Sequence, residues 1–375
     1  MAGARDLPVL APVAIRAWNL VVIAILALSL GACRSIGPAT VVRDRTDYGS
    51  SIGNSWKEQT LLNIVKLRYA DMPIFLEVAQ VIAGYKLQSA ISGSFTGGNA
   101  NASLIGPFTA SGNATAGSTY TDQPTVVYSP LTGIDFLKRL MTPVPPSSVM
   151  FMLQAGYSAQ RIMPILLDSV NGIANGSNRL QRSPDTRFTH LVRLVAEGQL
   201  AGTIEVRIER IKQGAESSLM VFPPIKDPGA VARRKEITNL LCLKPDLREF
   251  KVQYGAFSGR DDEIDMKTRS MLEIMLEFAA AVQVPEKDVA EGKATPGAAS
   301  TQKQAPLGGP PMRVLVGEAA PKDAYVAVPY NDRWYWIANT DIDSKTTFGV
   351  VMLLFSIADT GAKGATPVVT IPANQ

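Results

Sequence analysis

The chain has 375 residues, with 37 Lys or Arg against 33 Asp or Glu, so its formal net charge is only +4. This near balance lacks the basic surplus typical of nucleic-acid-binding domains, and we predict no nucleic-acid partner. A single histidine, His190, excludes a zinc site built from several histidines, and we predict neither a metal nor a cofactor.

The N-terminal segment has the order of a secretory signal. Arg5 and Arg16 precede the apolar run LVVIAILALSL at 20–30, which small residues and a cysteine follow. The run is shorter than the roughly 20 residues needed to cross a bilayer. We therefore predict a removable signal, residues 1–32, and no permanent membrane helix at this end of the chain.

The residues that end this segment, Leu30-Gly31-Ala32-Cys33, resemble the lipobox of bacterial lipoprotein precursors. The resemblance covers about the first tenth of the chain. It implies cleavage before Cys33, a diacylglyceryl thioether on its sulfur and acylation of its amine, which together make anchoring nearly irreversible. Arg34 at the next position, where Asp marks inner-membrane retention in enteric bacteria, implies the outer membrane. The alternative is a plain secreted protein with a chance cysteine.

Two features follow in the first third of the mature chain. Residues 33–54 are a predicted tether, after which Ser55-Trp56-Lys57-Glu58 has the pattern of a capping box for a helix that runs to about Tyr69. Residues 87–121 are rich in Gly, Ser, Ala and Thr, and Ala114 and Ala116 alternate with polar neighbours. This alternation predicts a long β-hairpin arm.

The rest of the main domain, 55–284, mixes helical and strand patterns. We predict helices over 184–197 and near 230–243, strands at 204–208, 218–222 and 249–254, and a helix over 263–283 from apolar residues at 3–4 spacing. The fold class is therefore α+β, an antiparallel sheet with packed helices plus the hairpin arm.

The last part of the chain begins after a compositional break. Residues 285–311 are rich in Pro, Gly, Ala and Lys without hydrophobic periodicity, which predicts a flexible linker. Beyond it, three short strands and an apolar helix over 348–358 predict a small β/α subdomain at 312–375. In the segment Trp334-Tyr335-Trp336, one face belongs to the core or forms an exposed stacking platform.

The candidate reactive side chains have plain structural explanations. His190 points away from the apolar face of its helix, so we expect a solvated surface histidine. After lipidation of Cys33, Cys242 has no cysteine left to pair with. Its apolar flanks, Leu241 and Leu243, predict a buried structural thiol and not a nucleophile.

Three further motifs have similar explanations. Residues 112–119 have the spacing of a phosphate loop but carry Ser118 where that loop needs lysine. For the acidic clusters 261–263 and 341–344 we expect helix N-capping, by Asp343 or Ser344 in the second case.

No complete catalytic motif is present in this sequence, and we predict no enzyme and no catalytic, cofactor-binding or metal-binding residues.

The leading hypothesis is a lipid-anchored, periplasm-facing lipoprotein of the outer membrane that acts as an interaction or assembly component. Its partners would be the membrane, through Cys33, and a protein or a second copy, through the 87–121 arm. One alternative is a ring-forming export lipoprotein whose protomers donate their hairpins to a shared β-structure, since a bilayer-crossing strand needs about 9–11 residues. Another is an envelope hydrolase or transferase.

Overall fold

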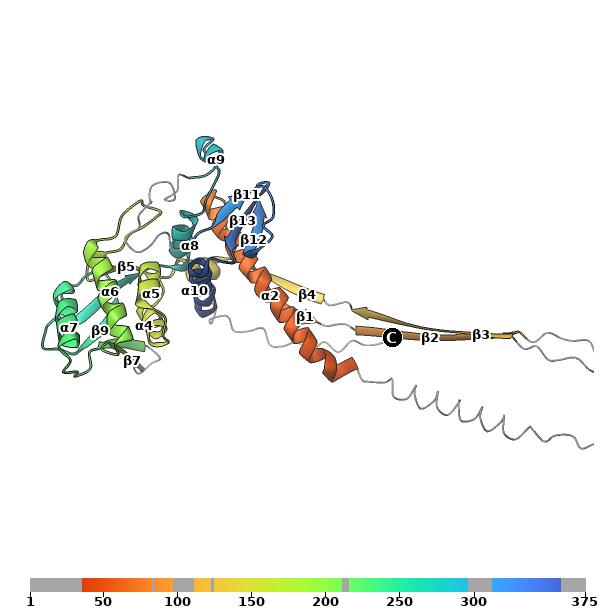
Figure 1. Cartoon of the computed structure of the whole chain (residues 1–375), viewed down its shortest axis with the longest axis horizontal. Helices are drawn as coiled ribbons and strands as arrows, with labels where there is room; N and C mark the ends of the chain where they lie inside the picture. Colours follow the sequence, from red (N-terminus) through yellow and green to blue (C-terminus); the bar gives the residue numbers. More distant parts are fainter. Residues whose placement is uncertain are drawn as a thin grey trace, which may run out of the picture. The chain divides into compact units, whose positions relative to one another are not determined.

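The computed structural model describes residues 36–82, 85–96, 111–122, 125–210, 216–295 and 312–358 (Figure 1). The chain divides into two compact units, residues 1–56 and 57–375. Helices pack with antiparallel and mixed sheets, so the predicted α+β class is confirmed. None of the helices in the described ranges is both long and apolar enough to cross a membrane.

The first described element is a helix where a tether was expected. Helix α2 runs without interruption over Ile36–Arg68, so Ser55 lies inside it and caps nothing. Pro38 does not prevent this, because it lies in the first turn, where a missing N–H leaves no hydrogen bond unmade. At 1.5 Å per residue, α2 is about 50 Å long.

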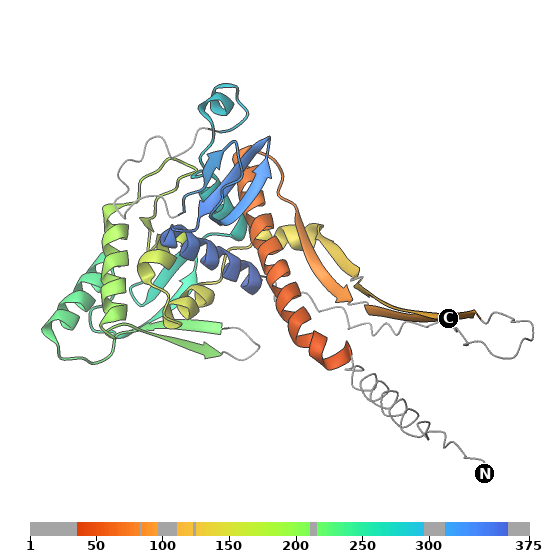
Figure 2. The ribbon, with the colours of Figure 1, turned by 45° about the vertical axis from the view of Figure 1, so that its right-hand side comes forward.

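The second unit contains a six-stranded sheet with the strand order β6-β5-β10-β9-β8-β7. Its strands β5, β7 and β9 lie beside helices α4–α7 in Figure 1, and Figure 2 shows the same region turned by 45°. Neighbouring strands are antiparallel except β9 and β10, which are parallel. The predicted strands at 204–208, 218–222 and 249–254 are confirmed, and the first two pair with each other. The strands are β5 (Leu167–Val170), β6 (Ile173–Ala174), β7 (Glu205–Arg210), β8 (Glu216–Val221), β9 (Glu249–Tyr254) and β10 (Glu263–Thr268).

Four helices pack on this sheet or on one another. Helix α4 contacts β7, β8 and β9, while α5 packs on α6 and α6 on α7. Their bounds are Pro146–Gln154 for α4, Ala159–Leu166 for α5, Thr186–Leu200 for α6 and Pro228–Leu240 for α7. The predicted helices over 184–197 and near 230–243 therefore exist, with shifted ends.

The predicted helix over 263–283 is wrong for its first third. Residues 263–268 form β10, and helix α8 covers only Met271–Ala279. The true start signal is a capping box inside the predicted span, between Ser270 and Glu273. Strand β10 lies between β5 and β9 and is buried on both faces. Its Ile264 and Met266 alternate with polar residues, which is a strand signal, but Ile264 also fits the 3–4 spacing of the apolar residues that follow.

The C-terminal elements share the hydrophobic core of the second unit. The three-stranded sheet has the order β11-β13-β12, and its buried Tyr335 and Ile337 belong to the same core cluster as Met275 and Phe278 of α8. Whether residues 312–375 form a separate subdomain stays a prediction. The elements are β11 (Leu315–Gly317), β12 (Ala324–Tyr330), β13 (Arg333–Ala338) and α10 (Ile342–Ala358).

The expected linker is only partly described. Its first residues form the short helix α9, Glu286–Ala290, and a turn that ends at Thr295. Asp288 of α9 accepts a hydrogen bond from Tyr69, and Ala294 is buried, so this portion is packed. The remainder, 296–311, lies outside the described residues.

Candidate interaction surface

A two-stranded antiparallel ribbon joins β1 (Phe75–Ile82) to β4 (Thr125–Leu131). One face of this ribbon packs on the core through Phe75. The Phe75 ring centroid lies 5.5 Å from that of Phe136 in helix α3, Ile134–Met141, and 5.3 Å from that of Phe355 in α10. The ribbon is thus fixed at one end by aromatic packing.

The opposite face of this ribbon is apolar and exposed. Its three cross-strand pairs, which we call the apolar ribbon face, are Leu76 with Pro130, Val78 with Tyr128, and Val81 with Val126. The exposed fractions are 46% for Leu76, 37% for Val126 and 58% for Tyr128. Contiguous exposed apolar side chains of this kind mark sites of interaction.

The first part of the β1 edge is closed by α2. Gln59 donates a hydrogen bond to the carbonyl of Leu76 (3.1 Å) and accepts one from its N–H (2.6 Å). Asn63 does the same for Ile74, at 2.7 and 2.9 Å. On β4, Pro130 has no N–H to offer. Pairing of another strand with these edges of β1 and β4 is therefore disfavoured. The apolar ribbon face is the part of this segment that remains available for contact.

Strands β2 (Tyr85–Thr96) and β3 (Ser111–Asp122) form the predicted hairpin arm and pair with each other over twelve positions. In this register the pairs Leu87–Tyr120 and Ile91–Ala116 alternate with polar pairs such as Gln88–Thr119. The same alternate positions also include the pair Ser89–Ser118, so the segregation of apolar and polar residues is only partial. Residues 112–119 lie in this strand pair and not at a strand-to-helix turn, so no phosphate loop is formed.

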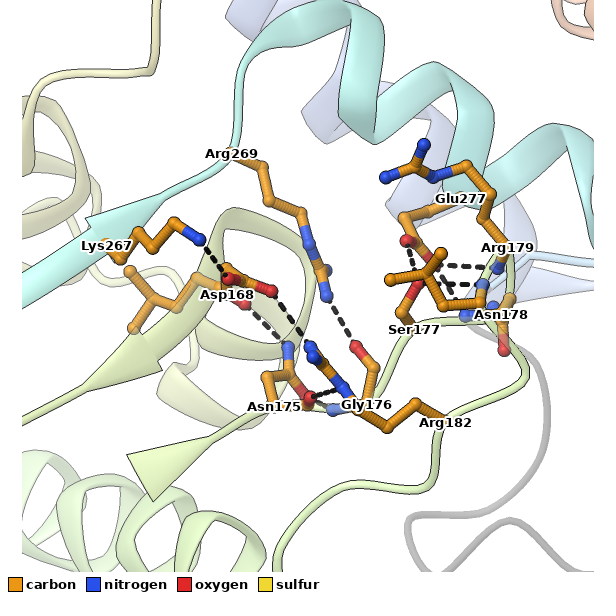
Figure 3. A network of polar contacts seen from close by, with 12 residues as sticks. Asp168, Asn175, Gly176, Ser177, Asn178, Arg179, Arg182, Lys267, Arg269 and Glu277 are labelled. Atoms are coloured by element: carbon orange, nitrogen blue, oxygen red, sulfur yellow. Dashed lines mark hydrogen bonds and ion pairs between the residues drawn. The ribbon is translucent and has the colours of Figure 1, made fainter. Parts of the chain in front are cut away.

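A buried polar network lies elsewhere, between β5, β10 and α8 (Figure 3). Arg269 is 5% exposed and donates to the carbonyls of Pro164 (2.8 Å), Ile165 (3.1 Å) and Gly176 (2.6 Å). Glu277 accepts hydrogen bonds from the Ser177 hydroxyl (2.5 Å) and the Asn178 N–H (2.6 Å). These contacts satisfy carbonyls at the end of α5 and the backbone of the loop after β6, which is a structural role.

A second part of this network is ionic. Asp168 accepts hydrogen bonds from Arg182 (3.0 Å) and Lys267 (2.9 Å). Partial burial of Asp168 opposes ionisation, but the two cations hold the pKa of this carboxyl below its usual range. The Asp168 carboxylate therefore links β5 to β10 through its ion pair with Lys267.

The predicted position of His190 at the surface is confirmed, with partners that the sequence did not reveal. Its Nε2 lies 2.5 Å from a Glu236 oxygen, and its Nδ1 lies 2.7 Å from a guanidinium nitrogen of Arg193. Both ring nitrogens are thus engaged by charged neighbours at the surface of α6 and α7.

The prediction of a buried Cys242 is wrong. Its side chain is exposed, and its φ of +55° places it in the left-handed region just after α7. Leu241 and Leu243 point into the core instead. A left-handed residue that ends a helix turns outward, and the apolar flanks of Cys242 could not indicate this.

Helix capping explains one acidic cluster and not the other. Asp341 caps α10 by accepting hydrogen bonds from the N–H (3.0 Å) and hydroxyl (2.9 Å) of Ser344, whereas Asp343 binds Arg161 (3.0 Å). Asp261 and Asp262 precede a strand, so no helix dipole is present there. They bind Lys244 and Arg260, respectively.

Two further expectations concern metal and lipid. In the described part of the chain, no group of three or more His, Cys, Asp or Glu side chains is arranged to hold a metal ion. Cys33, the predicted lipidation site, lies outside the described residues. The chain matches no protein-family model, no curated protein and no solved structure.

Proposed function

We propose that this protein is a lipid-anchored envelope lipoprotein that acts, without catalysis, as an interaction or assembly component. The observation that carries the proposal is the apolar ribbon face. Covering exposed apolar area is favourable by about 25 cal/mol per Å². A surface that leaves Leu76, Val126 and Tyr128 in water therefore gains from contact with a protein partner or a second copy.

The hairpin arm extends this surface. Ile82 pairs with Thr125 and Tyr85 with Asp122, so the same two segments of the chain form both ribbons in succession. Apolar and polar residues also alternate in part along the arm. We infer that β1–β4 and β2–β3 act together as one amphipathic contact element.

The location of the protein rests on the lipobox resemblance. A lipid on Cys33 would precede the start of α2 at Ile36 by three residues. A helix of about 50 Å, in place of a flexible tether, would then follow the anchor. The lipobox resemblance alone supports the outer membrane as the site of the anchor.

A second candidate function is a ring-forming export lipoprotein in which each protomer donates its hairpin to a shared β-structure. The specific observation is the length and alternation of the arm. Strands β2 and β3 have twelve residues each, more than the roughly 9–11 that cross a bilayer, and apolar and polar positions alternate in part along them. In the described part of the chain each pairs only with the other, so both outer edges are open.

The test uses acylated full-length protein in detergent and two charge-matched double variants. Ala114→Lys with Ala116→Lys adds charge to the apolar face of the arm. Asn113→Lys with Thr115→Lys adds the same charge to the polar face. Molar mass is measured by light scattering after size exclusion, with and without candidate envelope proteins crosslinked in vivo.

We expect the wild type and the Asn113→Lys/Thr115→Lys variant to form the same complex. The Ala114→Lys/Ala116→Lys variant should not form it. A mass of many protomers in detergent would favour the ring. A wild-type protein that stays monomeric and crosslinks to nothing would contradict the proposal, as would an apolar-face variant that assembles normally.

A further inference from the structure

Strand β7 is the last strand of the six-stranded sheet, and its outer edge is open. It pairs with β8 on one side, and in the described part of the chain no strand pairs with its other side. Proteins often block such edges with proline or a β-bulge. Strand β7 contains neither, because its six residues pair regularly with β8 and none of them is proline. The edge is therefore available to another strand.

The core side of β7 is incompletely covered at this edge. Val206 pairs with Met220, which is 3% exposed and belongs to the hydrophobic core. Ile204, Val206 and Ile208 lie on the same side as one another, since alternate residues of an extended chain point the same way. All three are only half-buried. Apolar area on this side of β7 thus stays in contact with water.

A cavity of about 400 Å³ lies on the same side, where α4 contacts β7 (Figure 1). Its apolar lining comes from α4, α6, β8 and the start of β7. These side chains are Met150, Leu153, Val195, Ile204, Val206 and Met220. Neighbouring strands of a sheet are about 4.8 Å apart and share their faces. A strand added to the β7 edge would therefore place its own core-side residues next to this cavity.

The other lining residues do not select a polar ligand. The Gln199 amide already donates to two backbone carbonyls (2.7 and 2.9 Å) and accepts from the N–H of Ala159 (3.1 Å). Gln154 and Glu205 are exposed, where water stabilises them, and Gly156 has no side chain. The occupant that the cavity favours is therefore apolar.

The opposite side of β7 carries complementary charges. Glu205 and Arg207 are both exposed. Arg207 binds Glu249 through Nη1 at 3.0 Å and remains 51% exposed, and no ion pair is found for Glu205 in the described residues. Charged side chains on an edge strand oppose pairing with most strands. They favour pairing with a strand that sets an opposite charge across from each of them.

A second copy of β7 meets both requirements. Side chains directly opposite in an antiparallel pair lie on the same face of the sheet, so a two-fold pair of β7 strands matches odd with odd and even with even positions. Centred on Val206, the pair sets Ile204 opposite Ile208 on the core side. It sets Glu205 opposite Arg207 on the other side. Because the contact is two-fold, each match occurs twice. Centred on Arg207, the pair would set two arginines opposite each other.

We propose that β7 pairs antiparallel with β7 of a second copy of this chain, about a two-fold axis at Val206. Ile208 of the second copy then lies opposite Ile204, beside the apolar cavity, and the two six-stranded sheets become one continuous sheet. This contact uses neither the apolar ribbon face nor the hairpin arm. It can therefore fail or succeed independently of the proposed function.

The first test is disulfide capture in acylated full-length protein that carries Cys242→Ser. At the two-fold axis Val206→Cys lies opposite its own copy, so mild oxidation should give a covalent dimer linked through residue 206. Mass spectrometry of the peptides identifies the link. The control is Lys251→Cys, an exposed residue of β9 in the interior of the same sheet, which should stay monomeric.

Charge reversal then tests the register. Adding Glu205→Arg to the Val206→Cys protein sets arginine opposite arginine at two places. This should weaken association by about tenfold or more and lower the linked fraction accordingly. Adding Arg207→Glu as well restores opposite charges across the axis, and the linked fraction should recover. Denaturant titration of each variant confirms that the monomer is folded.

Sedimentation equilibrium keeps the test open if Val206→Cys does not fold. It is carried out with Leu76→Ser and Tyr128→Ser present, which weaken association through the apolar ribbon face. In this background Glu205→Arg should weaken the remaining dimer, and Glu205→Arg with Arg207→Glu should restore it.

Three results would overturn the proposal. One is equal cross-linking at residues 206 and 251 or at neither. Another is a folded Glu205→Arg variant that associates like the wild type. The last is a double charge reversal that folds but does not regain the dimer lost in the single variant.

Discussion

Replacing Tyr128 and Leu76 by serine should weaken association through the apolar ribbon face while leaving the fold intact. Tyr128 is 58% exposed, so of the roughly 200 Å² of a tyrosine side chain about 115 Å² is still available for burial, worth about 3 kcal/mol. Leu76, at 46% exposed, adds about 1 kcal/mol. Because neighbouring sites are not strictly additive, we expect about 3–4 kcal/mol for the pair.

This loss corresponds to an association constant that is roughly a few hundredfold weaker, since 1.4 kcal/mol is about a factor of ten. The monomer should also become less stable, by about 2–3 kcal/mol, because the covered parts of both side chains are lost as well. Sedimentation equilibrium over a range of concentrations measures the first quantity, and chemical denaturation measures the second.

The matched control is Val127→Ser. Val127 is 41% exposed, similar to Leu76, but pairs with Gln80 on the other face of the same ribbon. It should associate like wild type. Equal weakening by Val127→Ser and Leu76→Ser would refute the assignment of the contact to one face, and so would a double variant that associates normally.

Three other outcomes are expected. Radiolabelled palmitate should enter the wild type but not Cys33→Ser, which should accumulate as unprocessed precursor; a labelled variant would disprove the anchor. Arg269→Met should lower the free energy of unfolding by about 3–5 kcal/mol, because three buried carbonyls lose their donor. The more exposed Arg182→Met should lower the free energy of unfolding by about 1 kcal/mol. Denaturant titration measures both values, and equal losses for the two variants would contradict the structural role of Arg269. In the folded protein, a thiol reagent should modify exposed Cys242 to one equivalent, and protection until unfolding would contradict the left-handed turn that places it outside.

The sequence by itself determined the elements whose signal is local. The alternation around Ala114 and Ala116 correctly predicted the hairpin, because a strand with one polar and one apolar face repeats every two residues. The same reasoning located β7, β8 and β9. It also excluded a phosphate loop at residues 112–119, since that loop needs a lysine and a helix that the sequence lacks.

Only the tertiary structure decided the elements whose residues face other parts of the chain. Ile264 fits both the 3–4 spacing of the helix that follows and a period-two alternation with Met266, and the place of β10 between β5 and β9 selects the strand. Similarly, the sequence shows Arg68 only as a basic residue in the last turn of a helix. The fold brings Tyr335, distant in sequence, close to it.

The candidate contact surface belongs to this second group. Both faces of β1 carry apolar residues, Phe75 on one and Leu76 on the other. Phe75 is buried because Phe136 and Phe355 cover it. Leu76 stays partly exposed because no described residue covers it to the same degree. Burial is a property of where distant aromatic rings pack, so no pattern within residues 75–82 could have shown which face would remain in water.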